Sequence, residues 1–268
     1  MTEATETLWQ QYSLANELNP AQRHRWRLIA REARATSRSH HVHAPRPPSD
    51  SADIRPPKAG AEVIIDLGCG SGALLQKIDE TQPGARLIGL DVEPVALDLA
   101  RARLPRAEFF AVDLCNGDAL EELRSSATLV LCSEVLEHLA QPEAAMRLAR
   151  QLLVAGGALI VTVPGGPMTQ FDRKIGHLRH YTLAEVSRLL SSSGFRLVHS
   201  YLWGFPFHTM FRMGMRRFPG AVDGYSDQRL GTGKRILLQL LHKLFFLNLR
   251  SQRHGRQIVA LAQSEGSL

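Results

Sequence analysis

The sequence predicts an α/β fold built on a mostly parallel sheet, because strand-like and helix-like segments alternate from residue 61 to about residue 203. The clearest strand begins at Val63, where a run of β-branched residues suits a strand buried on both faces. It leads into a glycine-rich turn, and a helical pattern begins at Ala73. A strand, a tight turn and a helix in this order form a cradle for a nucleotide-like ligand.

The turn itself has the spacing G-x-G-x-G, formed by Gly68, Gly70 and Gly72. Glycine lets the backbone turn sharply and leaves no side chain between the backbone and a ligand. The dinucleotide fingerprint has the different spacing G-x-G-x-x-G, which argues against a nicotinamide cofactor. Asp66 precedes the turn, and its carboxylate suits an ammonium group and can organise the loop. A purely structural turn without a ligand is the alternative.

Polar side chains follow the next three expected strands. Asp91 and Asp113 end the second and third strands, and Ser133 follows the fourth. Ligands in open α/β sheets bind at the carboxyl ends of the strands. Asp91 is placed to accept hydrogen bonds from ribose hydroxyls, and Asp113 from an adenine amino group. The three strands are expected at residues 86–90, 108–112 and 128–132.

The second half of the chain continues the alternation. Thr182 is a good N-cap with Glu185 three residues later, which predicts a capping box at a helix start. The remaining strands are expected at residues 158–163, 195–203 and 257–262, and a strongly apolar helix at 234–249.

Five motifs in order resemble those of the class I S-adenosylmethionine-dependent methyltransferases, over about residues 62–203. They are Asp66-x-Gly68-x-Gly70-x-Gly72, Gly89-Leu90-Asp91, Asp113-Leu114, Glu134-Val135-Leu136-Glu137-His138 and Gly156-Gly157-Ala158-Leu159-Ile160. The resemblance implies a Rossmann-like class I methyltransferase sheet with an antiparallel last strand between the fifth and sixth, and here a helical insertion before that strand. It also implies S-adenosylmethionine as the cofactor. The expected cofactor-binding residues are Asp66, Gly68, Gly70, Gly72, Asp91, Val92, Asp113, Leu114 and Ser133.

The segment from Glu134 to His138 is most similar to the O-methyltransferases of ubiquinone biosynthesis. Methylation of a hydroxyl requires removal of its proton, and a positioned base contributes a factor of about 10²–10⁴ in rate. His138, His177 and His180 are the candidate catalytic residues, because they follow the fourth and fifth strands on the expected substrate side. A purely structural role for these histidines is the alternative.

A divalent metal such as Mg²⁺ is a second hypothesis for the same segment. If it begins a helix, Glu134, Glu137 and His138 share one face. Two carboxylates and an imidazole can hold Mg²⁺, Mn²⁺ or Zn²⁺, and the metal would lower the pKa of a bound hydroxyl. The ubiquinone-type enzymes and the small-RNA 2′-O-methyltransferases that this segment also resembles are associated with metal here. Acidic residues at a helix N-terminus are also favourable without metal.

The chain divides into five expected regions. They are an N-terminal helical lid with a break at Asn19-Pro20 (1–36), a flexible linker (37–60), the cofactor-binding core (61–203), a helical cap insertion (204–254), and the last strand with a tail (255–268). Arg25 and Arg27 in the lid could reach the cofactor carboxylate, although solvent-exposed charges on an amphipathic helix are the simpler interpretation.

Composition excludes several classes of protein. No apolar run reaches the ~20 residues of a membrane span, and the polar, acidic N-terminus does not resemble a secretory signal. The expected location is therefore cytoplasmic. Residues 201–260 carry ten Lys or Arg and two acids. With the apolar helix, this composition suggests contact of residues 204–250 with the inner face of a membrane, or simply a cap packed on the domain.

The sequence thus predicts methyl transfer from S-adenosylmethionine to a small-molecule or lipid-like acceptor, at a hydroxyl oxygen. A metal-dependent RNA 2′-O-methyltransferase and a non-catalytic cofactor-binding protein are the alternatives. No RNA-binding module is recognisable, so nucleic acid is not the expected partner.

Overall fold

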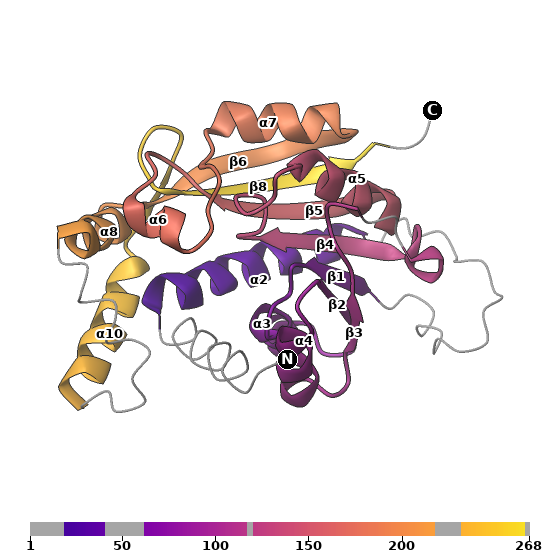
Figure 1. Cartoon of the computed structure of the whole chain (residues 1–268), viewed down its shortest axis with the longest axis horizontal. Helices are drawn as coiled ribbons and strands as arrows, with labels where there is room; N and C mark the ends of the chain where they lie inside the picture. Colours follow the sequence, from indigo (N-terminus) through magenta and orange to yellow (C-terminus); the bar gives the residue numbers. More distant parts are fainter. Residues whose placement is uncertain (1–18, 41–61, 117–119, 218–231, 266–268) are drawn as a thin grey trace.

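The first strand of the core lies in the interior of the sheet. β1 (Val63–Leu67) is buried at every position, and it pairs in parallel with β2 (Arg86–Asp91) and β4 (Ala127–Ser133). Its run of apolar and β-branched residues suits a strand that is covered on both sides. The computed structural model describes residues 19–40, 62–116, 120–217 and 232–265, which are coloured in Figure 1.

The sheet has eight strands in the order β3-β2-β1-β4-β5-β8-β6-β7. β3 (Glu108–Ala111) and β5 (Leu153–Pro164) extend the parallel part at either side. β8 (Gln257–Ser264) runs antiparallel to both of its neighbours, β5 and β6 (Phe195–Phe205). The expected Rossmann-like sheet is confirmed, including the position of its antiparallel last strand.

β7 (Leu249–Ser251) is a strand that the sequence does not predict. It pairs antiparallel with β6 at the edge of the sheet. It has only three residues and no buried one, so it lacks the alternating apolar pattern that marks a strand. The apolar helix expected at residues 234–249 ends at Phe245, because the chain has turned into β7 by Leu249.

Helices cover both faces of the sheet (Figure 1). α3 (Ala73–Thr81) and α4 (Pro94–Arg103) lie on one face, and α5 (Pro142–Leu152) and α7 (Leu183–Ser192) lie on the other. Successive strand residues point to opposite faces, so Ile64 packs in the α3 and α4 cluster while the next residue, Ile65, packs in the α5 and α7 cluster. Two shorter helices are η1 (Glu121–Leu123) and α6 (Gln170–Lys174).

The capping box of α7 is confirmed. The Thr182 hydroxyl accepts from the Glu185 amide at 3.2 Å, and the Glu185 carboxylate accepts from the Thr182 amide at 2.8 Å. Both bonds satisfy N–H groups that a helix start leaves unpaired. The cap fixes the position of the short segment that precedes α7 and carries two of the candidate histidines.

The N-terminal region is helical from Pro20. α2 (Pro20–His40) begins where the sequence predicts a break, and the Asn19 side chain accepts from the Ala21 amide at 2.9 Å. The helix continues four residues beyond residue 36, so residues 37–40 are helical and not part of a linker. Residues 1–18 of the expected lid and residues 41–61, which include the rest of the expected linker, lie outside the described residues.

The insertion before the last strand contains two described helices. The N-terminal end of α8 (Phe207–Arg217) is capped by Asn248, whose side-chain oxygen accepts from the amides of Phe207 and His208 at 2.8 and 3.2 Å. α10 (Thr232–Phe245) packs against α2 and α8. Residues 218–231 of the insertion lie outside the described part of the chain. Within the described part, no helix is both long and apolar enough to cross a bilayer.

Candidate active site

The glycine turn after β1 bends around the end of β2. The amides of Gly68 and Cys69 both donate to the Leu90 carbonyl, at 2.7 and 3.0 Å. Gly68, Gly70 and Gly72 all have positive φ angles, between 51° and 73°. A Cβ atom at Gly70 would meet no other atom within 4 Å. The backbone of the turn therefore faces open space at Gly70, which is where a ligand could approach it closely.

Asp91 connects this turn to the end of β2. One carboxylate oxygen accepts from the Gly70 amide at 2.8 Å, and the other accepts from the Glu93 amide at 3.0 Å. Val92, which lies between Asp91 and Glu93 in the sequence, is 65% exposed. Each carboxylate oxygen has two lone pairs, so Asp91 can hold the turn and still accept hydrogen bonds from ribose hydroxyls.

Asp66 lies beneath the turn. Only 2% of the surface of Asp66 is exposed to solvent. Burial, together with the nearby charge of Asp91, raises the pKa of its carboxyl well above the usual value. A positively charged group close by would favour the ionised form. The contact of Asp66 with an ammonium group stays a prediction.

Asp113 follows β3 and Ser133 ends β4, two parallel strands with β2 and β1 between them in the sheet. The Asp113 carboxylate accepts from the Cys115 amide and from the Asn116 side chain, both at 2.8 Å. The Ser133 hydroxyl is 2.9 Å from that of Thr162. Leu114 packs its side chain into the core, so only its backbone is available for a ligand. The expected cofactor residues thus lie along one edge of the sheet, at the carboxyl ends of β1, β2, β3 and β4.

Residues 134–138 form a turn and not the helix on which the metal hypothesis rests. Glu134 has a left-handed backbone with φ of 58°, and its side chain forms an ion pair with Arg25 and accepts a hydrogen bond from the Gln257 amide. Arg25 on α2 is buried, at 7% exposure. It therefore braces the end of β4 and is not the solvent-exposed charge that the sequence suggests.

Glu137 is completely buried. Neither of its carboxylate oxygens has a hydrogen-bond partner among the described residues. Burial, first of all, and the charge of Glu134 raise the pKa of this carboxyl well above the usual value. A buried carboxylate without partners is costly, unless it is protonated or a cation is bound.

The three candidate histidines lie together. The rings of His138 and His177 are 4.8 Å apart, and His177 Nδ1 is 3.1 Å from His180 Nε2. His138 Nδ1 is 3.2 Å from the Gly176 carbonyl, and His180 Nδ1 is 3.0 Å from the Gly166 carbonyl. The sequence analysis therefore selects residues that the fold does bring together.

The hydrogen bonds define which ring nitrogens remain available. Burial lowers the pKa of all three histidines, that of His177 to about 4, so the rings are neutral at pH 7. A neutral ring donates from one nitrogen and accepts at the other. His138 and His180 must donate from Nδ1 to carbonyl oxygens, so His177 must donate from Nδ1 to His180 Nε2. The Nε2 lone pairs of His138 and His177 have no hydrogen-bond partner among the described residues, and His138 is the exposed residue of the two.

Two further charged residues belong to this region and were not selected from the sequence. Asp172 on α6 accepts from Arg212 on α8 at 2.8 Å, and its other oxygen lies 3.7 Å from His180 Nε2. These residues are far apart in the chain and carry no motif. Only Thr169, which forms a capping box with Asp172, gives a local signal.

Comparison with known proteins agrees with this geometry. Residues 65–159 match the family described as "Methyltransferase domain". Over this stretch the chain is similar to methyltransferases. It is 38% identical over 112 residues to a trans-aconitate 2-methyltransferase of Methylobacterium radiotolerans, covering 41% of each chain. It is 33% identical over 99 residues to a ubiquinone biosynthesis O-methyltransferase of Cereibacter sphaeroides, covering 36% of this chain and 39% of that one.

Solved structures of methyltransferases share the fold of this chain. A Bacillus halodurans protein assigned as a methyltransferase has a TM-score of 0.53 at 17% identity, over 76% of this chain and 93% of that one. A geranyl diphosphate methyltransferase in complex with S-adenosylmethionine has a TM-score of 0.53 at 11% identity, over 76% and 78%. The methyltransferase resemblance is confirmed, but identity to the trans-aconitate enzyme is higher than to the ubiquinone enzyme. The chain spans about two fifths of the length of these two curated relatives.

Proposed function

We propose that this protein transfers a methyl group from S-adenosylmethionine to an oxygen atom of a small-molecule or lipid-like acceptor. The observation that carries this proposal is the open face of the glycine turn at Gly70, with Asp91 bound to that turn and Asp113 after the next strand along the same edge of the sheet. This arrangement provides backbone contact and hydrogen-bond acceptors for an adenosyl group along one edge of the sheet. The match to the methyltransferase domain family over residues 65–159 supports it independently.

The histidines supply what a hydroxyl acceptor needs. S-adenosylmethionine provides an electrophilic methyl group, whose bond to sulfur breaks as the bond to the acceptor oxygen forms. The acceptor must lose its proton, and in this proposal the Nε2 lone pair of the exposed His138 takes it. His177 and His180 are positioning residues in this proposal, because their hydrogen bonds connect the cluster to the loop at Gly166. Alignment alone can contribute about 7–11 kcal/mol to such a reaction.

A divalent metal remains a second proposal, with a changed set of ligands. Glu137, His138 and His177 offer three ligand atoms within 4.8 Å of one another, and the Glu137 oxygens lack partners among the described residues. Glu134 is already paired with Arg25, so it is replaced in the set by His177. A bound Mg²⁺ or Zn²⁺ would lower the pKa of an acceptor hydroxyl there.

Metal analysis separates the two proposals. If a metal acts, the purified protein should contain about one divalent ion per chain, Glu137→Gln should lose it, and chelation should abolish methyl transfer. If a histidine acts as the base, chelation should leave activity unchanged while His138→Gln lowers kcat by about 10²-fold or more. Retention of metal by Glu137→Gln would contradict the proposed ligand set.

The proposed methyl transfer is tested first by cofactor binding. S-adenosylmethionine should raise the melting temperature, whereas NAD and NADP should not. Methyl-labelled cofactor should then label trans-aconitate, a catechol or a component of a cell extract. Label entering only RNA would support the RNA 2′-O-methyltransferase alternative. Cofactor binding without any methyl transfer would favour the non-catalytic alternative, and absence of cofactor binding would refute the proposal.

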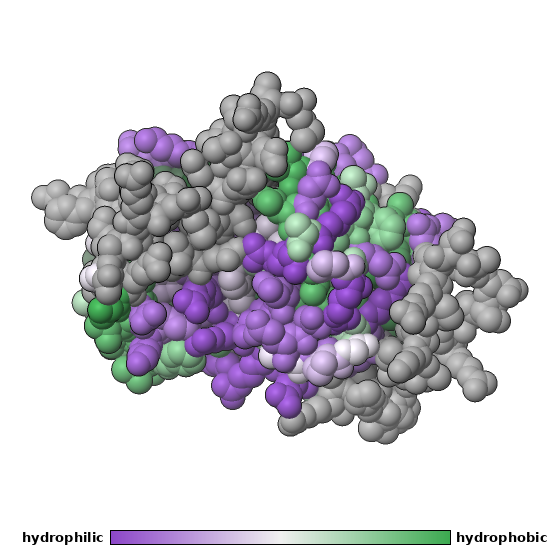
Figure 2. Space-filling view, turned by 90° about the horizontal axis from the view of Figure 1, so that it is seen from below, coloured by the Kyte–Doolittle hydropathy of each residue, from purple (hydrophilic) through white to green (hydrophobic). Residues whose placement is uncertain are grey.

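Contact with a membrane surface is proposed for the insertion. Four exposed apolar residues of α10 and its C-terminal end recur at helical spacing on one side, namely Ile236, Leu240, Leu244 and Leu247. Figure 2 shows hydrophobic surface at the left end of the molecule, the end at which Figure 1 shows α8 and α10. We expect the protein to sediment with vesicles of phosphatidylcholine and phosphatidylglycerol, and Leu240→Glu to reduce this. Equal sedimentation of the variant would contradict the proposal.

A further inference from the structure

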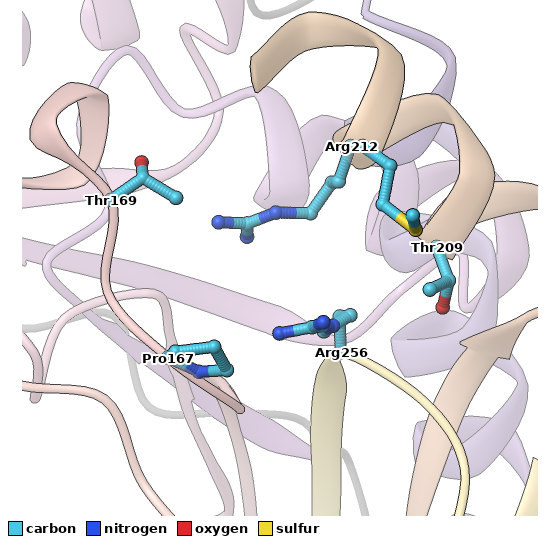
Figure 3. A pocket seen from close by; sticks show the side chains of 6 residues that line it. Pro167, Thr169, Thr209, Arg212 and Arg256 are labelled. Atoms are coloured by element: carbon cyan, nitrogen blue, oxygen red, sulfur yellow. The ribbon is translucent and has the colours of Figure 1, made fainter. Parts of the chain in front are cut away.

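A small pocket next to the histidine cluster is lined by arginines from two different elements. Arg212 comes from α8, and Arg256 immediately precedes β8. Figure 3 shows both side chains extending into the space beside Pro167 and Thr169. The pocket is lined by Pro167, Thr169, Thr209, Arg212, Met213 and Arg256.

The pocket has more positive than negative charge. Arg212 is paired with Asp172 at 2.8 Å. Arg256 has neither an ion pair nor a side-chain hydrogen bond with any described residue, and it is only partly exposed. An arginine held in a partly buried pocket without a carboxylate attracts an anion, since its planar fork matches a carboxylate or a phosphate.

The pocket shares a backbone segment with the candidate catalytic histidines. The Gly166 carbonyl lies 3.0 Å from His180 Nδ1. A Cβ atom at Gly166 would lie 2.6 Å from Arg256 Nη1, so the guanidinium is packed directly against this glycine. A group bound by Arg256 would therefore lie next to the loop that His180 contacts.

The location separates this pocket from the expected cofactor edge. The glycine turn follows β1, and the pocket lies beyond β5, with β4 between the two strands in the sheet. The enclosed part of the pocket has room for about one water molecule. It suits one oxygen of an anionic group and not a whole ligand. The rest of such a ligand would extend toward the histidines or toward solvent.

We propose that Arg212 and Arg256 bind an oxyanion of the methyl acceptor, a carboxylate or a phosphate, so that the acceptor is an acid. This inference rests on the proposed methyl transfer, since it assigns the acceptor side of the same site. Arg256 provides the unpaired charge. Arg212, oriented by Asp172, provides the second side of the pocket.

The inference is tested by direct binding of simple anions, without turnover. Calorimetry with tricarballylate and with inorganic phosphate, against sodium chloride at equal ionic strength, should show binding of at least one probe. The probe that binds distinguishes a carboxylate from a phosphate. Arg256→Gln should weaken that binding by about 10- to 100-fold, and Arg256→Lys should restore part of it. Arg253→Gln, an exposed arginine outside the pocket, should bind like the wild type.

Two outcomes would overturn the inference. One is a wild-type protein that binds neither anion above the sodium chloride control, and the other is equal binding by Arg256→Gln. Binding of S-adenosylhomocysteine is measured on the same samples and should be unchanged in every variant. Its absence in the wild type would refute the proposed methyl transfer, while the anion titrations would still report on the pocket. With an identified acceptor, Arg256→Gln should raise KM with little change in kcat.

Discussion

At the scale of single residues, the proposed cofactor site depends on a few atoms at the ends of strands. Asp91 has the most direct role, because it holds the Gly70 amide and remains able to accept further hydrogen bonds. The sequence predicts this residue from its place after a strand. It does not predict the burial of Arg25 or its pairing with Glu134, because these depend on α2 packing beside residues more than 100 positions away in the chain.

Replacement of Asp91 by Asn should weaken cofactor binding more than folding. The amide retains the size of the side chain but loses the charge that strengthens bonds from ribose hydroxyls and from the Gly70 amide. We expect the Kd for S-adenosylhomocysteine to rise by about 10- to 100-fold in calorimetry. Asp98→Asn, which changes an exposed carboxylate on α4, is the matched control. A Kd unchanged in Asp91→Asn would remove this residue from the site.

At the scale of elements, local signals identify most boundaries correctly. Thr182 and Glu185 mark the start of α7, and Asn19-Pro20 marks the start of α2. β7 and the turn at residues 134–138 were missed because their form depends on neighbours. β7 is a strand only because β6 offers it an edge, and the backbone at Glu134 is fixed by the Thr162 carbonyl, which accepts from its amide at 2.9 Å.

Two glycines test how much an element depends on close packing. At Gly89 in β2 a Cβ atom would lie 2.6 Å from the Phe109 ring and 2.7 Å from Cys69 Sγ. Gly89→Ala should therefore lower the free energy of unfolding by about 1–3 kcal/mol. At Gly214 in α8 nothing lies within 4 Å, and Ala is the better helix former, so Gly214→Ala should raise it by up to about 1 kcal/mol. Urea unfolding measures both, and effects of the same sign would contradict the packing argument.

At the scale of the whole molecule, buried histidines connect the N-terminal helix to the insertion. His24 on α2 and His208 on α8 both stack on Trp203 of β6, with ring centroids 4.7 and 4.9 Å away. His242 on α10 lies 6.3 Å from His24. Burial lowers the pKa of all three, that of His24 to about 4, with Arg27, Arg250 and His242 adding to the effect at His24.

This cluster predicts a loss of stability in mild acid. Below pH 6.5 the unfolded chain takes up protons that the folded histidines do not, so the free energy of unfolding falls as the pH falls. The stabilisation is complete above about pH 6.5 and is lost progressively down to about pH 4, with roughly 3 kcal/mol from His24 alone.

Unfolding measured in urea between pH 4 and pH 7.5 tests this dependence. His24→Phe keeps an aromatic ring against Trp203 and removes one titrating group, so its stability should depend less on pH over that range. His254→Phe, which changes an exposed histidine outside the cluster, should behave like the wild type. An equal pH dependence in His24→Phe and wild type would contradict a role for His24.

The sequence by itself determined the sheet, its glycine turn and the acidic residues at the strand ends. These features follow from short-range patterns, since a buried parallel strand, a tight turn and a helix start each require particular residues within a few positions. Only the tertiary structure decided which side chains of the site face one another. Three features depend on this: Glu134 pairs with Arg25, the Glu137 oxygens lack partners among the described residues, and Arg212 and Arg256 line one pocket. They arise because α2, α8 and the segment before β8 converge on the ends of β4 and β5. No local sequence pattern encodes that convergence.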